Sequence, residues 1–251
     1  MHRHIDLDVV SHSWNYGRLL AYQISSLFLY PSQYNVRLTI VCCPEDTRTL
    51  ATIGFFVADE RIPENLTIRP WLLKKENLMR RAIGRNAVAL TEDADVLWYA
   101  DCDYLFREGT TKDGQVFGNC IDALMETDLS DEQIVYPRWI QKTESMEAGD
   151  ELMKEMDVLD VRDVPEEKFC WSKLTRAVGG AQIVKGSTAR RYGYLPDNAK
   201  HQQPSDVWLK TRCDVAYRRE IAAGRGTGIQ LPGVYRIRHS EYGRENPGVQ
   251  N

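Results

Sequence analysis

The sequence has no apolar run long enough to cross a membrane. Its longest apolar stretch near the N-terminus, LLAYQISSLFLY, is interrupted by Gln23, Ser25 and Ser26 and is shorter than the roughly 20 residues of a spanning helix. The first residues, MHRHIDLD, lack the apolar core of a signal peptide. We therefore expect a cytoplasmic protein without a membrane span.

Cysteine pairs with metal-ligand spacing are also missing. The six cysteines are scattered along the chain, and the adjacent Cys42 and Cys43 end an apolar stretch. This pattern favours reduced thiols over disulfides or structural zinc. No internal repeat or Gly/Ser/Pro linker divides the 251 residues, and 43% of them are hydrophobic, enough for a substantial core. We therefore expect one α/β domain.

Charge is nearly balanced overall, with 36 acidic and 32 basic residues, but it is unevenly distributed. Residues 141–168 contain ten acidic and four basic side chains, a net charge of −6. Residues 175–244 contain five acidic and thirteen basic side chains, a net charge of +8. The C-terminal third is therefore the expected place for an anionic ligand, with a solvated basic face as the alternative.

The stretch around which the rest is best organised is Val96 to Phe106, VLWYADCDYLF. Its first five residues are apolar or aromatic and predict a short buried strand, which ends in two carboxylates separated by a cysteine. Because side chains alternate along an extended chain, Asp101 and Asp103 are expected on one side, where they could bind a divalent cation. The alternative is that both residues simply open a turn.

The segment Gly84 to Tyr104, GRNAVALTEDADVLWYADCDY, resembles a motif of GT-A fold glycosyltransferases, especially family 2 and galactosyltransferase-like relatives. These enzymes carry Asp-x-Asp (the DxD motif) after a buried strand and an Arg-Asn pair on the preceding helix. The resemblance implies a GT-A (Rossmann-like) single catalytic domain over 1–251, with a mostly parallel central sheet flanked by helices. Residues 1–106 would bind the nucleotide-sugar, and 107–251 would form the acceptor half.

Strand and helix patterns follow one another along the chain in the order expected of an α/β fold. The predicted strands are 5–11, 35–43, 66–73, 96–100, 134–140 and the start of 233–244, and regular structure is expected to resume at 178–186. The predicted helices are 16–30, 47–58, 74–90 and 119–127. The long acidic segment 141–172 has only short helical patterns and is predicted to be a lid or binding loop.

Five residues of the first half are candidates for nucleotide binding, because ligands of open α/β sheets lie beyond the C-terminal ends of the strands. His12 and Trp14 follow the first strand, where the resemblance implies contacts with the base; packing of the Trp ring is the alternative. Asp46 follows the second strand and could contact the nucleotide or cap the next helix. Arg85 and Asn86 form the Arg-Asn pair, and Arg85 could reach a diphosphate bidentately, unless it is an exposed helix residue.

Three further candidates come from the acceptor half. Gly180 belongs to a Gly-Gly pair that the resemblance places beside the ligand, and glycine permits close approach. Asp206 is predicted to be the catalytic base, because sugar transfer with inversion needs a carboxylate that removes a hydroxyl proton; a helix N-cap is the alternative. His239 follows an alternating strand, where the resemblance implies a third metal ligand; a surface histidine is the alternative.

The resemblance thus implies metal-dependent, inverting hexosyl transfer from a nucleoside diphosphate sugar, first of all a UDP-sugar, to an acceptor hydroxyl. Asp103 would bind Mn²⁺ or Mg²⁺, and Asp101 would orient the ribose or the metal shell. The sequence does not identify the acceptor, although the basic C-terminal third raises a polyanion such as hydroxymethylated DNA, which some bacteriophages glycosylate. The alternatives are a nucleotidyltransferase, for which the Gly-rich basic loop after Ser11 is missing, and a non-catalytic nucleotide-sugar-binding protein.

Overall fold

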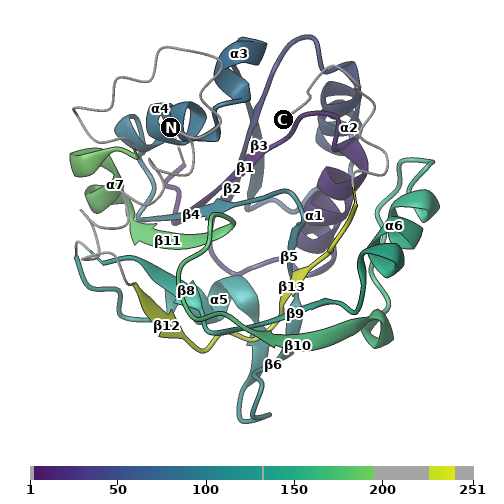
Figure 1. Cartoon of the computed structure of the whole chain (residues 1–251). Helices are drawn as coiled ribbons and strands as arrows, with labels where there is room; N and C mark the ends of the chain where they lie inside the picture. Colours follow the sequence, from purple (N-terminus) through teal and green to yellow (C-terminus); the bar gives the residue numbers. More distant parts are fainter. Residues whose placement is uncertain (1–2, 132, 195–225, 241–251) are drawn as a thin grey trace.

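A seven-stranded sheet forms the centre of the computed structural model, which describes residues 3–131, 133–194 and 226–240 (Figure 1). The strand order is β12-β8-β11-β4-β1-β2-β3. The strands are β1 (Leu7–His12), β2 (Val36–Cys42), β3 (Leu66–Leu72), β4 (Val96–Ala100), β8 (Val135–Pro137), β11 (Ala181–Lys185) and β12 (Thr227–Ile229). Neighbouring strands are parallel except at β11, which is antiparallel to β4 and β8. The predicted mostly parallel sheet is therefore confirmed.

Apolar side chains on both faces of the sheet form two hydrophobic cores. In β4, Trp98 and Ala100 belong to one core, whereas Leu97 and Tyr99 belong to the other, as strand alternation requires. Helices α1 (Gly17–Leu29) and α2 (Thr47–Val57) cover the first face, and α4 (Arg81–Leu90) and α7 (Gly186–Tyr192) cover the second (Figure 1). In the described part of the chain, no helix is both long and apolar enough to cross a membrane.

A second, four-stranded sheet packs beside the first, with the strand order β10-β9-β13-β5. Its strands are β5 (Tyr104–Phe106), β9 (Trp139–Thr143), β10 (Phe169–Lys173) and β13 (Val234–Arg236). A two-stranded hairpin, β6 (Glu108–Thr110) and β7 (Phe117–Asn119), projects from this region and leads to α5 (Cys120–Met125) (Figure 1). The second sheet matters for function because it places the residues after β13 next to those after β4.

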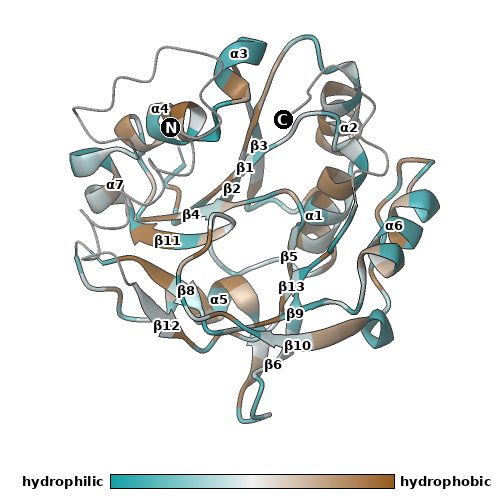
Figure 2. Cartoon of the chain, viewed as in Figure 1, coloured by the Kyte–Doolittle hydropathy of each residue, from teal (hydrophilic) through white to brown (hydrophobic). Residues whose placement is uncertain are grey.

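The acidic segment 141–172 is built into the second sheet. It contains most of β9, then α6 (Met146–Glu155), the short 3₁₀ helix η1 (Glu166–Lys168) and most of β10. Leu152, Met153 and Met156 are each at most 1% exposed, while the outer face of α6 is hydrophilic (Figure 2). The segment therefore contributes apolar side chains to the core.

Two predicted elements are wrong. The helix predicted over 74–90 is broken into α3 (Lys75–Leu78) and α4, because Arg80 has a non-helical backbone (φ −105°, ψ 76°). The strand predicted over 134–140 is split into β8 and β9, which belong to different sheets, and the Arg138 N–H between them donates to the Ile229 carbonyl (2.7 Å). Neither break coincides with a glycine.

A buried charge cluster lies at the end of the sheet where β1 begins. Arg37 donates to a carboxylate oxygen of Asp8 (2.7 Å) and also to Glu92, and both acids are at most 2% exposed. Burial, with the nearby Asp8 charge, raises the pKa of Glu92 to about 7. The Glu92 carboxyl is therefore protonated at mildly acidic pH.

Candidate active site

The predicted Asp-x-Asp lies at the edge of the central sheet where β1 and β4 end side by side. These strands are parallel neighbours in the register Leu7↔Val96, so His12 at the end of β1 and Asp101 after β4 leave the same edge. Strand β13 then pairs with β5 in the register Arg236↔Tyr104, and the Ile237 N–H donates to the Asp103 carbonyl (2.8 Å). Residues far apart in the sequence thereby converge.

A pocket of about 270 Å³ opens at this point. Five of the predicted site residues line it: His12, Trp14, Asp101, Asp103 and His239. The other lining residues are Ser13, Tyr16, Leu78, Met79, Arg81, Cys102 and Arg236. The site predicted from separate motifs is therefore one continuous surface. A larger hollow of about 520 Å³ lies at the opposite end of β4 and contains none of the predicted site residues.

Asp101 is held by two arginines of helix α4. Arg81 Nη1 donates to Asp101 Oδ1 (2.6 Å), and Arg85 Nη2 donates to the same oxygen (3.2 Å). Burial alone would raise the pKa of Asp101, but the positive charges of Arg81 and Arg85 outweigh it and hold the pKa below its usual range. Asp101 is therefore an ionised carboxylate with a fixed orientation.

Asp103 pairs with the second sheet. Arg236 Nε donates to Asp103 Oδ2 (2.8 Å), whereas the buried Oδ1 has no hydrogen-bond partner among the described residues. The residue is 4% exposed, and this burial raises the pKa of its carboxyl, although Arg236 opposes the shift. An unpartnered buried carboxylate oxygen is costly unless a ligand completes its coordination. Asp103 Oδ1 is therefore suited to bind a cation.

Arg85 lies beneath the pocket. Its side chain is fully buried, donates to the Tyr194 hydroxyl (3.0 Å) and stacks near the rings of Tyr99 and Tyr194. The alternative interpretation of Arg85 as an exposed helix residue is therefore wrong. Arg85 instead contacts Asp101 from the interior of the protein. Arg81, one helical turn earlier on the same face, reaches the pocket surface.

Three other predicted residues support the site without lining it. Asp46 caps α2, accepting from the Thr49 N–H (3.0 Å), and also accepts from the Asn15 N–H (2.7 Å), which fixes the loop that carries Trp14. Asn86 Oδ1 accepts from the Tyr194 N–H (2.8 Å). Gly180 is packed so tightly that an added Cβ would lie 2.5 Å from the Tyr104 ring and 2.9 Å from Asp101 Oδ2.

The remaining two candidates have different outcomes. His239 lines the pocket, and its ring packs edge-on against Tyr16 with the centroids 5.0 Å apart. His239 shares the pocket with Asp101 and Asp103, but the donor atoms of these three residues are not all within 4.8 Å of one another. Among the described residues, the group that meets this distance lies elsewhere. Asp206 lies outside the described residues, so its role stays a prediction.

Arg81 and Arg236 are the charged pocket residues that were not predicted from the sequence as site residues. Arg81 carried a signal, because it lies four residues before Arg85 and so on the same helix face. Arg236 is one of the basic residues near His239 in the sequence, but only the pairing of β13 with β5 brings it to Asp103. With these two and Arg85, three arginines face two aspartates, so the site carries one excess positive charge when both carboxylates are ionised.

The comparisons with known proteins identify the fold. The chain is similar to S. aureus TarS, with a TM-score of 0.52 and 9% identity, over 93% of this chain and 37% of that one. It matches TarS 1-349 in complex with UDP-GlcNAc with a TM-score of 0.52, 9% identity and coverages of 96% and 61%. It matches the UDP complex with a TM-score of 0.50, 8% identity and coverages of 93% and 60%. No protein-family model and no curated protein matches the sequence.

The architecture and these neighbours show that the chain has the GT-A fold, a mixed α/β fold with a mostly parallel central sheet. This confirms the fold predicted from the sequence. The chain spans 37% and 61% of the lengths of the first two matched structures, so the similarity concerns only part of each of them.

Proposed function

We propose that the protein transfers a sugar from a nucleoside diphosphate sugar to an acceptor hydroxyl, with the help of a divalent cation. The observation that carries the proposal is the convergence of His12, Trp14, Asp101, Asp103 and His239 on one pocket at the C-terminal edge of the sheet. The fold supports it, since the similar TarS structures include complexes with UDP-GlcNAc and with UDP. A UDP-sugar is accordingly the donor proposed for this chain.

The charges in the pocket suit a diphosphate. Arg81 and Arg236 line the pocket, where their guanidinium groups place positive charge beside Asp101 and Asp103. Arginine binds phosphate oxygens bidentately, so these two side chains are proposed to hold the diphosphate, while the buried Arg85 keeps Asp101 in place. The diphosphate role that the sequence suggested for Arg85 is thus assigned to Arg81.

Mn²⁺ or Mg²⁺ fits the acidic side of the pocket. Asp103 Oδ1 is buried and lacks a hydrogen-bond partner among the described residues, and carboxylate oxygens are the ligands that these cations prefer. Asp103 and His239 would hold the cation, and Asp101 would orient its shell or the ribose. When bound, the cation would neutralise charge that develops on the departing diphosphate.

The other end of the pocket suits the nucleoside. Trp14 is only 8% exposed, and the Lys75 ammonium lies 4.5 Å from its ring centroid. Most of the ring is therefore buried against neighbouring residues, and its small accessible part lines the pocket. Asp46 fixes the loop beneath it by accepting from the Asn15 N–H. His12 and Trp14 are therefore proposed to contact the base or ribose. Asp46 and Asn86 are proposed to act indirectly, by accepting hydrogen bonds from the backbone N–H groups of Asn15 and Tyr194.

Inversion requires a general base on the acceptor side of the pocket. Asp206 is proposed for this role from its place after the Gly-Gly element in the sequence. Its carboxylate would take the proton of the acceptor hydroxyl as the new glycosidic bond forms and the bond to the diphosphate breaks. The leaving group is then a nucleoside diphosphate held by Arg81 and Arg236.

The proposal is tested by calorimetric titration of UDP into the protein in Mn²⁺ and in EDTA. The parent should bind UDP tightly only in Mn²⁺. Asp103→Ala should weaken that binding at least about tenfold, because metal affinity falls by about this factor even when only a residue that hydrogen-bonds to a metal ligand is removed. Asp113→Ala is the matched control, since this exposed carboxylate lies on the β6–β7 hairpin. Equal UDP affinity in parent and Asp103→Ala, with circular dichroism unchanged, would refute the site.

A further inference from the structure

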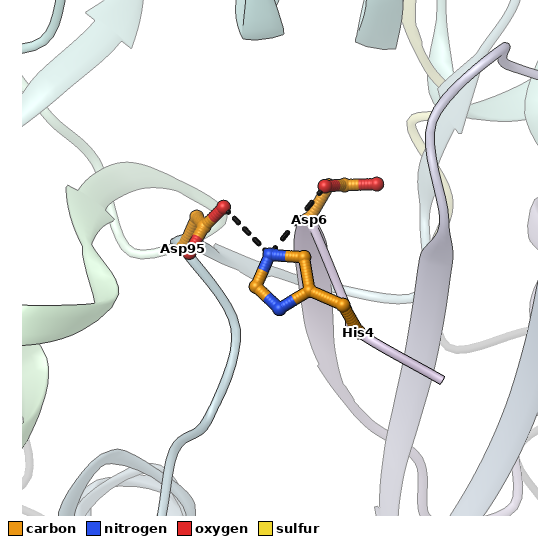
Figure 3. Close-up of side chains that lie close together, drawn as sticks. All are labelled: His4, Asp6 and Asp95. Carbon is orange, nitrogen blue, oxygen red and sulfur yellow. Dashed lines mark hydrogen bonds and ion pairs between the residues drawn. The ribbon is translucent and has the colours of Figure 1, made fainter. Parts of the chain in front are cut away.

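A second group of potential metal ligands lies at the opposite end of the central sheet. It consists of His4, Asp6 and Asp95, whose donor atoms all lie within 4.8 Å of one another (Figure 3). His4 and Asp6 precede β1, and Asp95 precedes β4, the parallel neighbour of β1. Because Asp6 and His12 are six residues apart on an extended chain, the group is about 20 Å from the proposed donor pocket.

The spacing of these donor atoms resembles that of a coordination shell. His4 Nε2 lies 2.9 Å from Asp95 Oδ2 and 3.7 Å from Asp6 Oδ1. Ligands about 2.1 Å from a tetrahedral Zn²⁺ are separated from one another by about 3.4 Å, so the two observed distances bracket the value that a bound ion requires. Each of these two donor pairs would therefore reach that value with a shift of about half an ångström or less.

Hydrogen bonds hold the carboxylate of Asp6 and the backbone of Asp95 in place. Asp6 Oδ2 accepts from the Asn35 N–H (2.7 Å), which leaves Oδ1 directed at His4. The Asp95 N–H donates to the Ile5 carbonyl (3.3 Å), and the Asp95 carbonyl accepts from the Gly186 N–H (2.7 Å). A preorganised site loses less conformational entropy when the ion binds.

The ligand types favour a first-row transition metal. One imidazole and two carboxylates suit Zn²⁺ and related borderline ions better than Mg²⁺ or Ca²⁺, which prefer oxygen ligands alone. The side chains of His4 and Asp95 are 61% and 59% exposed, so an ion from solution can reach the site and keep water in its remaining positions.

We infer that His4, Asp6 and Asp95 form a zinc-type transition-metal site, separate from the donor pocket. A metal bound there links the segment before β1 to the start of β4. Since binding to the native state alone adds stability, the ion raises the free energy of unfolding without contacting the donor.

The experiment is calorimetric titration of the full chain with Zn²⁺ at pH 8, together with thermal unfolding with and without Zn²⁺. The parent should bind one equivalent that is lost in both His4→Ala and Asp95→Asn. Asp128→Asn, which removes an exposed carboxylate of the same surface region, should retain that equivalent. Zn²⁺ should raise the melting temperature of the parent and of the control more than that of the two site variants.

Two comparisons make the outcome decisive. Asp103→Ala removes the proposed donor-site ligand, so the equivalent assigned to His4 must persist in that variant, whether or not the donor site binds metal. The same Zn²⁺ stoichiometry and affinity in the parent, His4→Ala and Asp95→Asn would overturn the inference, and the His4–Asp95 contact would then be a surface hydrogen bond alone.

Discussion

Gly180→Ala is expected to damage both the fold and the donor pocket. A Cβ at this position would lie 2.5 Å from Tyr104 Cε2 and 2.9 Å from Asp101 Oδ2, closer than carbon atoms normally approach either group. The Tyr104 ring is fully buried and Asp101 is held by Arg81 and Arg85, so neither can move freely. Overpacking of this kind costs about 1–3 kcal/mol, and each kcal/mol lowers the melting temperature of a chain of this size by about 2–4 °C.

The matched control for this prediction is Gly54→Ala. Gly54 lies inside helix α2, and an added Cβ would meet no atom within 4 Å. The substitution should therefore stabilise the protein by about 0.5–1 kcal/mol through the greater helix propensity of alanine. Neither glycine has a positive φ, so backbone strain does not confuse the comparison.

The assay combines urea unfolding with calorimetric binding of UDP in Mn²⁺. Gly180→Ala should lower the unfolding midpoint without changing the slope of the transition, and should weaken UDP binding because Asp101 and its arginines are displaced. Gly54→Ala should raise the midpoint and leave UDP affinity unchanged. A Gly180→Ala protein as stable as the parent, with the same UDP affinity, would refute the close packing of Gly180 against Tyr104 and Asp101.

Three further predictions concern single carboxylates, those of Glu92, Asp150 and Asp206. Because the raised pKa of Glu92 means that the native state binds the extra proton, the free energy of unfolding should fall as pH rises from about 4.5 to about 7, and Glu92→Gln should flatten that slope in urea unfolding. Asp150 accepts from the Ser240 N–H (3.0 Å) and hydroxyl (2.6 Å), so Asp150→Ala should weaken Mn²⁺-dependent UDP binding in calorimetry, and unchanged affinity would contradict this. Asp206→Asn should keep the parent's melting temperature, because asparagine caps as well as aspartate, but lower sugar transfer about a hundredfold; equal transfer rates would make Asp206 a cap.

Local patterns were sufficient to predict much of the donor half. The predicted strand 96–100 coincides with β4, because its apolar run is bounded by an acidic turn on each side. The two possibilities raised for Asp46 included the helix cap, and the structure has that cap. Short-range signals were informative here because a strand of a parallel sheet is buried on both faces and so stands out in the sequence.

The parts that could not be predicted depend on contacts between distant segments. Arg236 reaches Asp103 only because β13 pairs with β5, and the 131 residues between Tyr104 and Arg236 do not indicate that register. The break before Arg81 likewise lacks a proline or glycine. Tertiary packing decides both features, and it overrides local propensity.

The acidic segment 141–172 supports the donor pocket through the segment that follows β13. Gly149 of α6 packs on the chain so closely that an added Cβ would lie 1.7 Å from the Arg238 carbonyl oxygen. Thr143 at the end of β9 accepts from the Arg238 N–H (2.8 Å), and Asp150 holds Ser240. Residues on both sides of His239 are therefore fixed by this segment. Movement of α6 would expose the buried Met153 and release His239 together, so the geometry of the cation site proposed for Asp103 and His239 depends on the packing of α6.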